Sequence, residues 1–361
     1  MKMRKQLSRL LFFTAFSVLV WSCNQSEPTP KGDYVAGVFV INEGNFSQNN
    51  GTISYFTREQ TTAEADVFSK VNGSTLKGGV QGYAAIGEHG VILVDNFTAG
   101  MDKVEFVNSN TFQHLGTIGS PDIENPREVV LAGTKAYVSC WGNIAGNNYS
   151  QGYIAVIDLN TKKVNKKINI SGGPENLVFA GGKLFAGTVS YGGGKTLTVI
   201  DAATETIVKS ITLDAAATPI GLDANGKLWV GAGLKALRVD PGSYAVETTL
   251  TIGSDASKSA GNFAFTTDLR SIIFTLSYFD ANFDPKGETY KFGIGDSQIN
   301  LATPLIKRVF SGLSIDPSQG LIYAGVTPSY AQAGYAVRYR SDGSLVDSIK
   351  VNVAPTGFFF K

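Results

Sequence analysis

The sequence has few of the residues that carry enzyme chemistry or link chains covalently. Among its 361 residues there are only two cysteines and two histidines. Cys23 lies at the end of an N-terminal signal segment, so Cys140 is the one cysteine of the chain that follows the cleavage site region. A single cysteine excludes a disulfide within that part of the chain. We expect Cys140 to be a small apolar strand residue. His89 and His114 have no metal-binding or nucleophile motif beside them, and we interpret both as structural or solvated.

Recognisable catalytic motifs are lacking as well. The sequence contains no Gly-x-Ser-x-Gly, no Cys-x-x-Cys and no phosphate-binding loop. We therefore predict that the protein is not an enzyme and that it needs no organic cofactor.

Charge of either sign is also scarce. Charged residues make up 17% of the chain. The first 22 residues hold four basic side chains and no acidic ones, so their removal lowers Lys+Arg from 31 to 27 against 30 acids, a net charge of −3. This balance argues against nucleic acid as a partner.

Residues 1–22 have the organisation of a lipoprotein signal peptide. Basic residues precede an apolar run, Leu10 to Trp21, which is too short to span a bilayer as a helix. The end of the run, Leu19 to Cys23, resembles the lipoprotein signal-peptidase site, at which Cys23 is lipidated and becomes the new N-terminus. The alternative is an ordinary secretory signal with an incidental cysteine. Residues 23–33 then read as a tether without a core of its own.

The rest of the chain repeats a unit of four short apolar runs, best seen in Pro174 to Leu213. Short runs bounded by turn residues are typical of strands. Starts equivalent to Pro174 recur 41 to 51 residues apart. They are Gln81, Pro126, Pro174, Pro219, Ala260, Ser311 and Pro355. Four antiparallel strands in each repeat of about 40 residues predict the blades of a propeller.

The two ends of this region predict how the ring closes. Val38 to Ile41 matches the second strand of a repeat, whereas Phe358 to Phe360 matches a first strand. We therefore predict an all-β, seven-bladed β-propeller over residues 34–361, with four-stranded antiparallel blades and a C-terminal strand that completes the first blade. Such closure leaves no free sheet edge.

The predicted connections differ between the two faces of the ring. Links from first to second strand and from third to fourth strand are short, and both kinds lie on one face. Links from second to third strand lie on the other face, which we name the long-loop face. These longer links are residues 43–51, 95–102, 141–152, 190–195, 277–288 and 327–334. Long loops on a rigid scaffold are where binding usually resides.

The long loops carry aromatic rings among amide and hydroxyl side chains. This chemistry suits a large, neutral, hydrogen-bonding ligand. The alternative is that the aromatic residues pack the loops against one another. The ligand-binding candidates in the loops are Asn45, Phe46, Asn96, Phe97, Trp141, Asn143, Tyr149, Tyr191, Tyr278, Asn282 and Tyr330.

Two charged residues could reach the same face from the innermost strands. Arg127 follows Pro126 and Glu175 follows Pro174, so both lie near strand starts and are further ligand-binding candidates. The alternative is a salt bridge between adjacent blades.

One loop also has calcium-like spacing. Asp280, Asn282, Asp284 and Glu288 place oxygen atoms at intervals that calcium loops use, with Gly287 before the last carboxylate. The alternative is an ordinary Asp/Asn-rich turn.

The opening of the domain resembles a known family. Val38 to Phe46, with the core Asn42-Glu43-Gly44-Asn45, and Asn50 to Ser54 are similar to the start of YncE-like lipoprotein β-propellers of Gram-negative outer membranes. The resemblance implies a lipid-anchored, surface-exposed outer-membrane protein. The BtuG-type members of this group bind cobalamin and pass it to a TonB-dependent transporter, so the resemblance implies cobalamin or a related corrinoid as ligand.

Other functions stay open at this point. The long-loop face could instead dock another envelope protein as a scaffold, or bind a glycan or a peptide. Lactonases and quinoproteins are also propellers, so fold analogy alone keeps an enzyme as an alternative.

Overall fold

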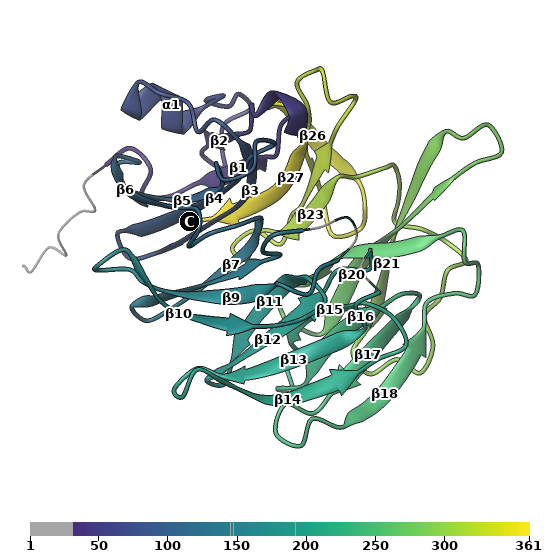
Figure 1. The fold of residues 1–361 in the computed structure, drawn as a ribbon. Helices are drawn as coiled ribbons and strands as arrows, with labels where there is room; N and C mark the ends of the chain where they lie inside the picture. The colour runs from purple at the N-terminus through teal and green to yellow at the C-terminus, as the bar shows by residue number, and fades with distance from the viewer. Residues whose placement is uncertain (1–31, 145, 147, 192) are drawn as a thin grey trace, which may run out of the picture.

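A computed structural model describes residues 32–144, 146, 148–191 and 193–361 (Figure 1). The predicted signal peptide, Cys23 and most of the tether lie outside these residues. The described chain forms seven antiparallel sheets arranged as blades. Within the described part, no helix is long and apolar enough to cross a membrane.

Each blade takes its strands in chain order from the centre of the ring outward, except blade 1. Blade 1 contains β1 (Val38–Asn42), β2 (Thr52–Phe56) and the C-terminal β27 (Pro355–Phe360). Blade 2 contains β3 (Gly79–Ile86), β4 (His89–Asp95), β5 (Lys103–Asn108) and β6 (His114–Gly119). Blade 3 contains β7 (Pro126–Ala132), β8 (Lys135–Cys140), β9 (Tyr153–Asp158) and β10 (Lys163–Asn169). Blade 4 contains β11 (Pro174–Ala180), β12 (Lys183–Thr188), β13 (Thr196–Asp201) and β14 (Thr206–Thr212).

The remaining three blades follow the same order. Blade 5 contains β15 (Ala217–Leu222), β16 (Leu228–Ala232), β17 (Lys235–Val239) and β18 (Val246–Thr251). Blade 6 contains β19 (Ser259–Phe265), β20 (Ser271–Phe279), β21 (Pro285–Gly293) and the short β22 (Ile306–Lys307). Blade 7 contains β23 (Gly312–Ile315), β24 (Ile322–Val326), β25 (Tyr335–Tyr339) and β26 (Leu345–Lys350). The predicted seven-bladed propeller is therefore confirmed.

Burial along the strands follows their place in the blade. The second strands, such as β12 and β16, are almost wholly buried because both of their faces pack against neighbouring blades. The fourth strands are mostly exposed, and in β10 exposed and more buried residues alternate. Cys140 ends β8 fully buried, as expected, and burial raises the pKa of its thiol to about 12.

The ring closes through both ends of the chain. β27 pairs antiparallel with β1, with Val38 opposite Phe360 and Val40 opposite Phe358. Figure 1 shows the yellow β27 beside the purple β1. The predicted permuted closure, in which the C-terminal strand completes the first blade, is confirmed.

Blade 1 differs from the expected four strands. It has three, and its outer position is reduced to a single bridge between Tyr55 and Glu64. The segment 57–66 offers few apolar side chains to alternate with polar ones, so it does not form an outer strand. Helix α1 (Val67–Asn72) follows, with the Asp66 carboxylate accepting a hydrogen bond from the Ser69 backbone N–H at its start.

The link at residues 277–288 also differs from the expectation. The sequence predicts a long loop here, but β20 and β21 pair from Ser271 opposite Gly293 to Phe279 opposite Pro285. Only residues 280–284 are left as the turn. From Lys286 to Thr289 partly exposed and buried residues alternate, as in a strand, which favours an extended hairpin.

Candidate functional site

The long-loop face is where the innermost strands begin. In blade 3, Pro126 at the start of β7 pairs with Cys140 at the end of β8, and the link 141–152 follows directly. Blade 4 repeats this arrangement, with Pro174 opposite Thr188. Side chains at the second position of an innermost strand therefore lie next to the long loops.

Arg127 connects three blades at this position. Its Nη1 lies 3.0 Å from Oδ2 of Asp95 in blade 2, and its Nε lies 3.6 Å from Oε2 of Glu175 in blade 4. The guanidinium carbon is 4.1 Å from the centre of the Trp141 ring, a cation–π distance. These contacts are the ion pairs between blades that the alternative interpretation of Arg127 and Glu175 expected.

Trp141 and Tyr149 complete this group. The indole N–H of Trp141 donates to Oε2 of Glu175 at 2.7 Å, and its ring meets Tyr149 edge to face at 5.2 Å. Burial raises the pKa of Glu175, although Arg127 and the Trp141 hydrogen bond oppose that rise. Burial likewise raises the pKa of Asp95, again against the effect of Arg127. The structure thus brings four predicted site residues together, which are Arg127, Trp141, Tyr149 and Glu175.

A cavity of about 440 Å³ lies between the first residues of the innermost strands. Glu43, Arg127, Glu128 and Glu175 are its charged lining residues, and Gln81 donates to Oε1 of Glu43 at 3.1 Å. We name it the central cavity. Burial raises the pKa of Glu128 to about 7. Three carboxyl groups around one guanidinium make this cavity acidic.

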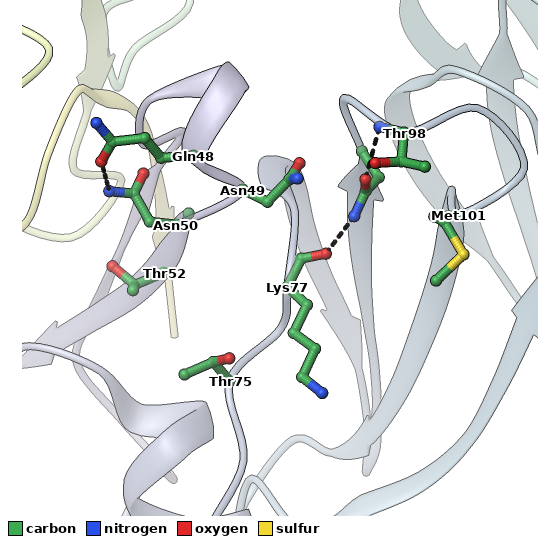
Figure 2. A pocket seen from close by; sticks show the side chains of 10 residues that line it. Gln48, Asn49, Asn50, Thr52, Thr75, Lys77, Thr98 and Met101 are labelled. Carbon is green, nitrogen blue, oxygen red and sulfur yellow. Dashed lines mark hydrogen bonds between the residues drawn. The ribbon is translucent and has the colours of Figure 1, made fainter.

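A second and larger cavity, about 650 Å³, opens between the loops of blades 1 and 2. Figure 2 shows Lys77 between the segment that carries Gln48 to Asn50 and the loop between β4 and β5 that carries Thr98 and Met101. Asn96 belongs to the lining, and its Nδ2 donates to the Lys77 carbonyl oxygen at 2.6 Å. The lining residues are Gln48, Asn49, Asn50, Gly51, Thr52, Thr75, Lys77, Asn96, Thr98 and Met101.

Further predicted residues form the rim beside this cavity. The rings of Phe46 and Phe97 meet edge to face at 5.6 Å and are 44% and 60% exposed. Asn45 donates through Nδ2 to the Tyr330 carbonyl oxygen at 3.2 Å, which joins the loops of blades 1 and 7. Five predicted residues from three blades, Asn45, Phe46, Asn96, Phe97 and Tyr330, therefore lie around one region.

The other predicted ligand-binding residues lie apart from these two groups. Asn143 and Asn282 are exposed, and Tyr191 is 71% exposed on the loop of blade 4. The Tyr278 hydroxyl lies 3.4 Å from Oε1 of Glu288, and the Lys258 ammonium lies 4.3 Å from the centre of the Tyr278 ring. These four residues do not contribute to a common cavity with Arg127 or Asn96.

The predicted calcium residues have other hydrogen-bond partners. Oδ1 of Asp280 accepts the backbone N–H groups of Asn282 at 2.9 Å and Asp284 at 3.0 Å, which is the pattern of an Asx turn. Glu288 accepts a hydrogen bond from Tyr290 at 2.9 Å. Among the residues that the structure describes, no group of three or more His, Cys, Asp or Glu side chains is arranged to hold a metal. Calcium binding remains a prediction.

Sequence reasoning missed several cavity residues. Gln81 and Glu128 line the central cavity, but the rule that selected Arg127 and Glu175 takes the residue directly after a repeat start and misses both. Gln81 is itself a predicted start, and Glu128 lies one residue beyond Arg127. Lys77 carried no such signal, because it lies between blades in a segment without a repeat counterpart.

Comparison with known proteins places the chain in a family. A model described as "Domain of unknown function (DUF5074)" matches residues 36–360. The chain belongs to the DUF5074 family. No curated protein matches it.

Solved structures similar to this DUF5074 chain are propellers at low identity. A quinonprotein alcohol dehydrogenase-like protein from Bacteroides thetaiotaomicron is 16% identical over 91% of this chain and 78% of its own, with a TM-score of 0.60. A Bacteroides fragilis protein provisionally described as a 6-phosphogluconolactonase is 12% identical over 91% and 98%, with a TM-score of 0.65. The WD40 domain of Neurospora crassa Pan2 is 9% identical over 78% and 81%, with a TM-score of 0.52. At these identities the likeness shows the fold alone.

Proposed function

We propose that this protein is a lipid-anchored binding protein of the outer membrane that captures a large, hydrogen-bonding ligand on its long-loop face. The observation that supports this proposal is the presence of two cavities at that face, about 650 and 440 Å³, within the usual range of ligand sites. Both are lined by residue types that the sequence pattern selected. Binding rather than catalysis is proposed, because the cavity side chains include no nucleophile paired with a base.

The finer proposal concerns the ligand and its recipient. The opening of the domain resembles BtuG-type lipoproteins, so cobalamin or a related corrinoid is the first ligand to test and a TonB-dependent transporter is the proposed recipient.

Calorimetric titration of the domain 34–361 with cyanocobalamin, against a panel of neutral oligosaccharides, tests the ligand. Trp141→Ala should weaken cobalamin binding by about 1–3 kcal/mol, as expected for a partly buried aromatic anchor. Trp141→Phe serves as the matched variant, because it keeps a ring under Arg127 and loses only the hydrogen bond to Glu175. Absence of heat and of a thermal shift with cobalamin would exclude this ligand and leave the binding face to other candidates.

Membrane anchoring has its own test. If Cys23 carries the lipid, Cys23→Ala should release the protein from the membrane fraction, and globomycin should block processing of the wild type. Protease treatment of whole cells then reports exposure at the surface. A Cys23→Ala protein that stays in the membrane fraction would contradict the anchor.

A docking role is the second candidate, and one observation favours it. Phe279 and Phe283 at the turn of the β20–β21 hairpin are 68% and 85% exposed, which is unusual for large apolar side chains. Large exposed apolar groups often mark interaction sites. Changing both to serine should abolish transporter binding without changing ligand affinity if the hairpin docks. Unchanged co-purification with a co-expressed transporter would argue against this role.

A further inference from the structure

The cavity between the loops of blades 1 and 2 continues into a second hollow. That hollow, about 570 Å³, lies between helix α1 and the outer strands β5 and β6 of blade 2. The two share Thr75 and Lys77 as lining residues. Together they form one groove, which we name the blade 1–2 groove, with Lys77 at its middle.

Neutral hydrogen-bonding groups dominate the walls of this groove. Amides come from both ends, and hydroxyls lie between them. They include the amides of Gln48, Asn49 and Gln113 and the hydroxyls of Ser74, Thr75 and Thr98. Some of these amides are occupied within the protein: Asn72 donates to the carbonyl oxygens of Phe68 and Phe112. Among the residues that the structure describes, the hydroxyls of Ser74, Thr75 and Thr98 and the amide of Gln113 have no such partner, and groups of this kind can bind the hydroxyl groups of a sugar.

The charges of the groove do not cancel. Glu105 is its one carboxylate, and both of its oxygens are occupied: the Lys103 ammonium lies 2.6 Å from Oε1, and His114 Nε2 lies 3.0 Å from Oε2. Lys77 forms no ion pair with any residue that the structure describes. An unpaired cation in a hollow attracts an anionic group more strongly than one on an open surface.

The backbone holds Lys77 in an unusual conformation. Its φ is +56°, a region that side chains other than glycine and asparagine seldom adopt. The Asn96 amide fixes the carbonyl oxygen of Lys77 at 2.6 Å, and the preceding Leu76 is fully buried as an anchor. Local strain of this kind persists where neighbouring structure enforces it, often at ligand sites.

From these observations we infer that the blade 1–2 groove binds an acidic saccharide, that is, a sugar chain with a carboxylate or sulfate group placed against Lys77. Amides and hydroxyls bind its neutral hydroxyl groups. The exposed edge-to-face pair of Phe46 and Phe97 beside the groove supplies an apolar surface for the C–H face of a sugar ring. The inference rests on the proposed ligand-capturing function and specifies the ligand class of this part of the face.

Calorimetric titration of the domain 34–361 with matched saccharides tests the inference. Trigalacturonic acid carries carboxylates, a carrageenan-derived oligosaccharide carries sulfate without carboxylate, and galactotriose is the neutral counterpart. At least one acidic saccharide should bind on the order of tenfold more tightly than galactotriose, because hydrogen bonds to charged groups contribute more than neutral ones. The preference should shrink as salt is added.

Lys77→Gln is the decisive variant, with Lys209→Gln as its control. Lys209 lies on the exposed outer strand β14 of blade 4, so its removal lowers the net charge equally. Lys77→Gln should abolish the preference for the acidic saccharide, whereas Lys209→Gln should keep it. If Lys77→Gln lowers the stability of the protein, titration of the wild type at increasing salt concentration tests the same charge interaction without a substitution.

Three outcomes would overturn the inference. They are equal binding of acidic and neutral saccharides, retention of the preference in Lys77→Gln, and tighter binding of an acidic peptide of the same charge. A parallel cyanocobalamin titration separates this result from the proposed function. Cobalamin binding without saccharide binding would remove the acidic-saccharide assignment and leave ligand capture supported.

Discussion

At the scale of single residues, the ionisation of Glu128 in the central cavity couples the stability of the fold to pH. Burial raises the pKa of Glu128 from 4.5 to about 7. Below pH 4.5 both the folded and the unfolded chain carry it protonated. Between pH 4.5 and about 7 the unfolded chain ionises first, so this residue makes the free energy of unfolding fall as pH rises.

Glu128→Gln should therefore stabilise the protein at pH 8 and leave it nearly unchanged at pH 4.5. We expect a gain of about 1–2 kcal/mol at pH 8, less than the full pKa shift gives, because the side chain keeps some contact with solvent in the cavity. Urea unfolding at both pH values measures it. Glu59→Gln, at an exposed turn, is the control and should show no such difference. An equal effect of Glu128→Gln at both pH values would contradict the raised pKa.

Arg127 shows how far sequence reasoning reaches at this scale. Its place near the strand start predicted that it faces the long loops, and the structure confirms that position. The ion pair with Glu175 was the alternative that the sequence offered. The Asp95 partner was not predictable, because Asp95 comes from the end of a strand in the preceding blade. Contacts between blades depend on how the sheets twist, and the spacing of repeats in the sequence does not predict that twist.

At the scale of elements, Gly51 holds the first long loop against blade 2. A Cβ atom at this position would lie 2.6 Å from the Glu43 carbonyl oxygen and would also clash with the backbone nitrogen of Val80. Both neighbours are backbone atoms, so neither can rotate away. The loop 43–51, and with it one wall of the blade 1–2 groove, depends on glycine here.

Gly51→Ala should lower the free energy of unfolding by about 1–3 kcal/mol, as overpacking does, and weaken binding in the blade 1–2 groove. Gly295→Ala is the matched control, because a Cβ atom there meets nothing within 4 Å. Urea unfolding and saccharide titration of both variants provide the comparison. If the two variants prove equally stable, loop 43–51 is not held in this way.

Elements that repeat were predictable from sequence, and elements that interrupt the repeat were not. The seven innermost strands, among them the closing β27, follow from periodic starts such as Pro126 and Pro174. Helix α1 was missed because Val67 and Phe68 appear once, without a counterpart in another blade. The sequence predicts a loop where the β20–β21 hairpin lies, because Asp and Asn are typical of turns, although the pairing of the two strands continues to Phe279.

At the scale of the whole molecule, the ring is closed by the six-residue strand β27 and by contacts of Lys361, which follows it. The Lys361 ammonium lies 2.9 Å from the Ser109 carbonyl oxygen, and the Lys361 carbonyl accepts from Arg58 Nη1 at 2.9 Å. Arg58 in turn pairs with the buried Asp316 at 2.7 Å. The C-terminus thus connects blade 1 to blades 2 and 7.

Deleting residues 355–361 should abolish cooperative unfolding of the entire ring. The deletion removes the strand that pairs with β1, so the inner edge of β1 loses its hydrogen-bond partners. It also removes the strand that packs against β23 in blade 7. Lys361→Ala is the graded control: it keeps β27 and loses only the ammonium contacts, so we expect a lower midpoint with one sharp transition. Thermal unfolding followed by circular dichroism distinguishes the two. A deletion variant that melts cooperatively near the wild-type midpoint would show that the ring does not depend on the C-terminal strand.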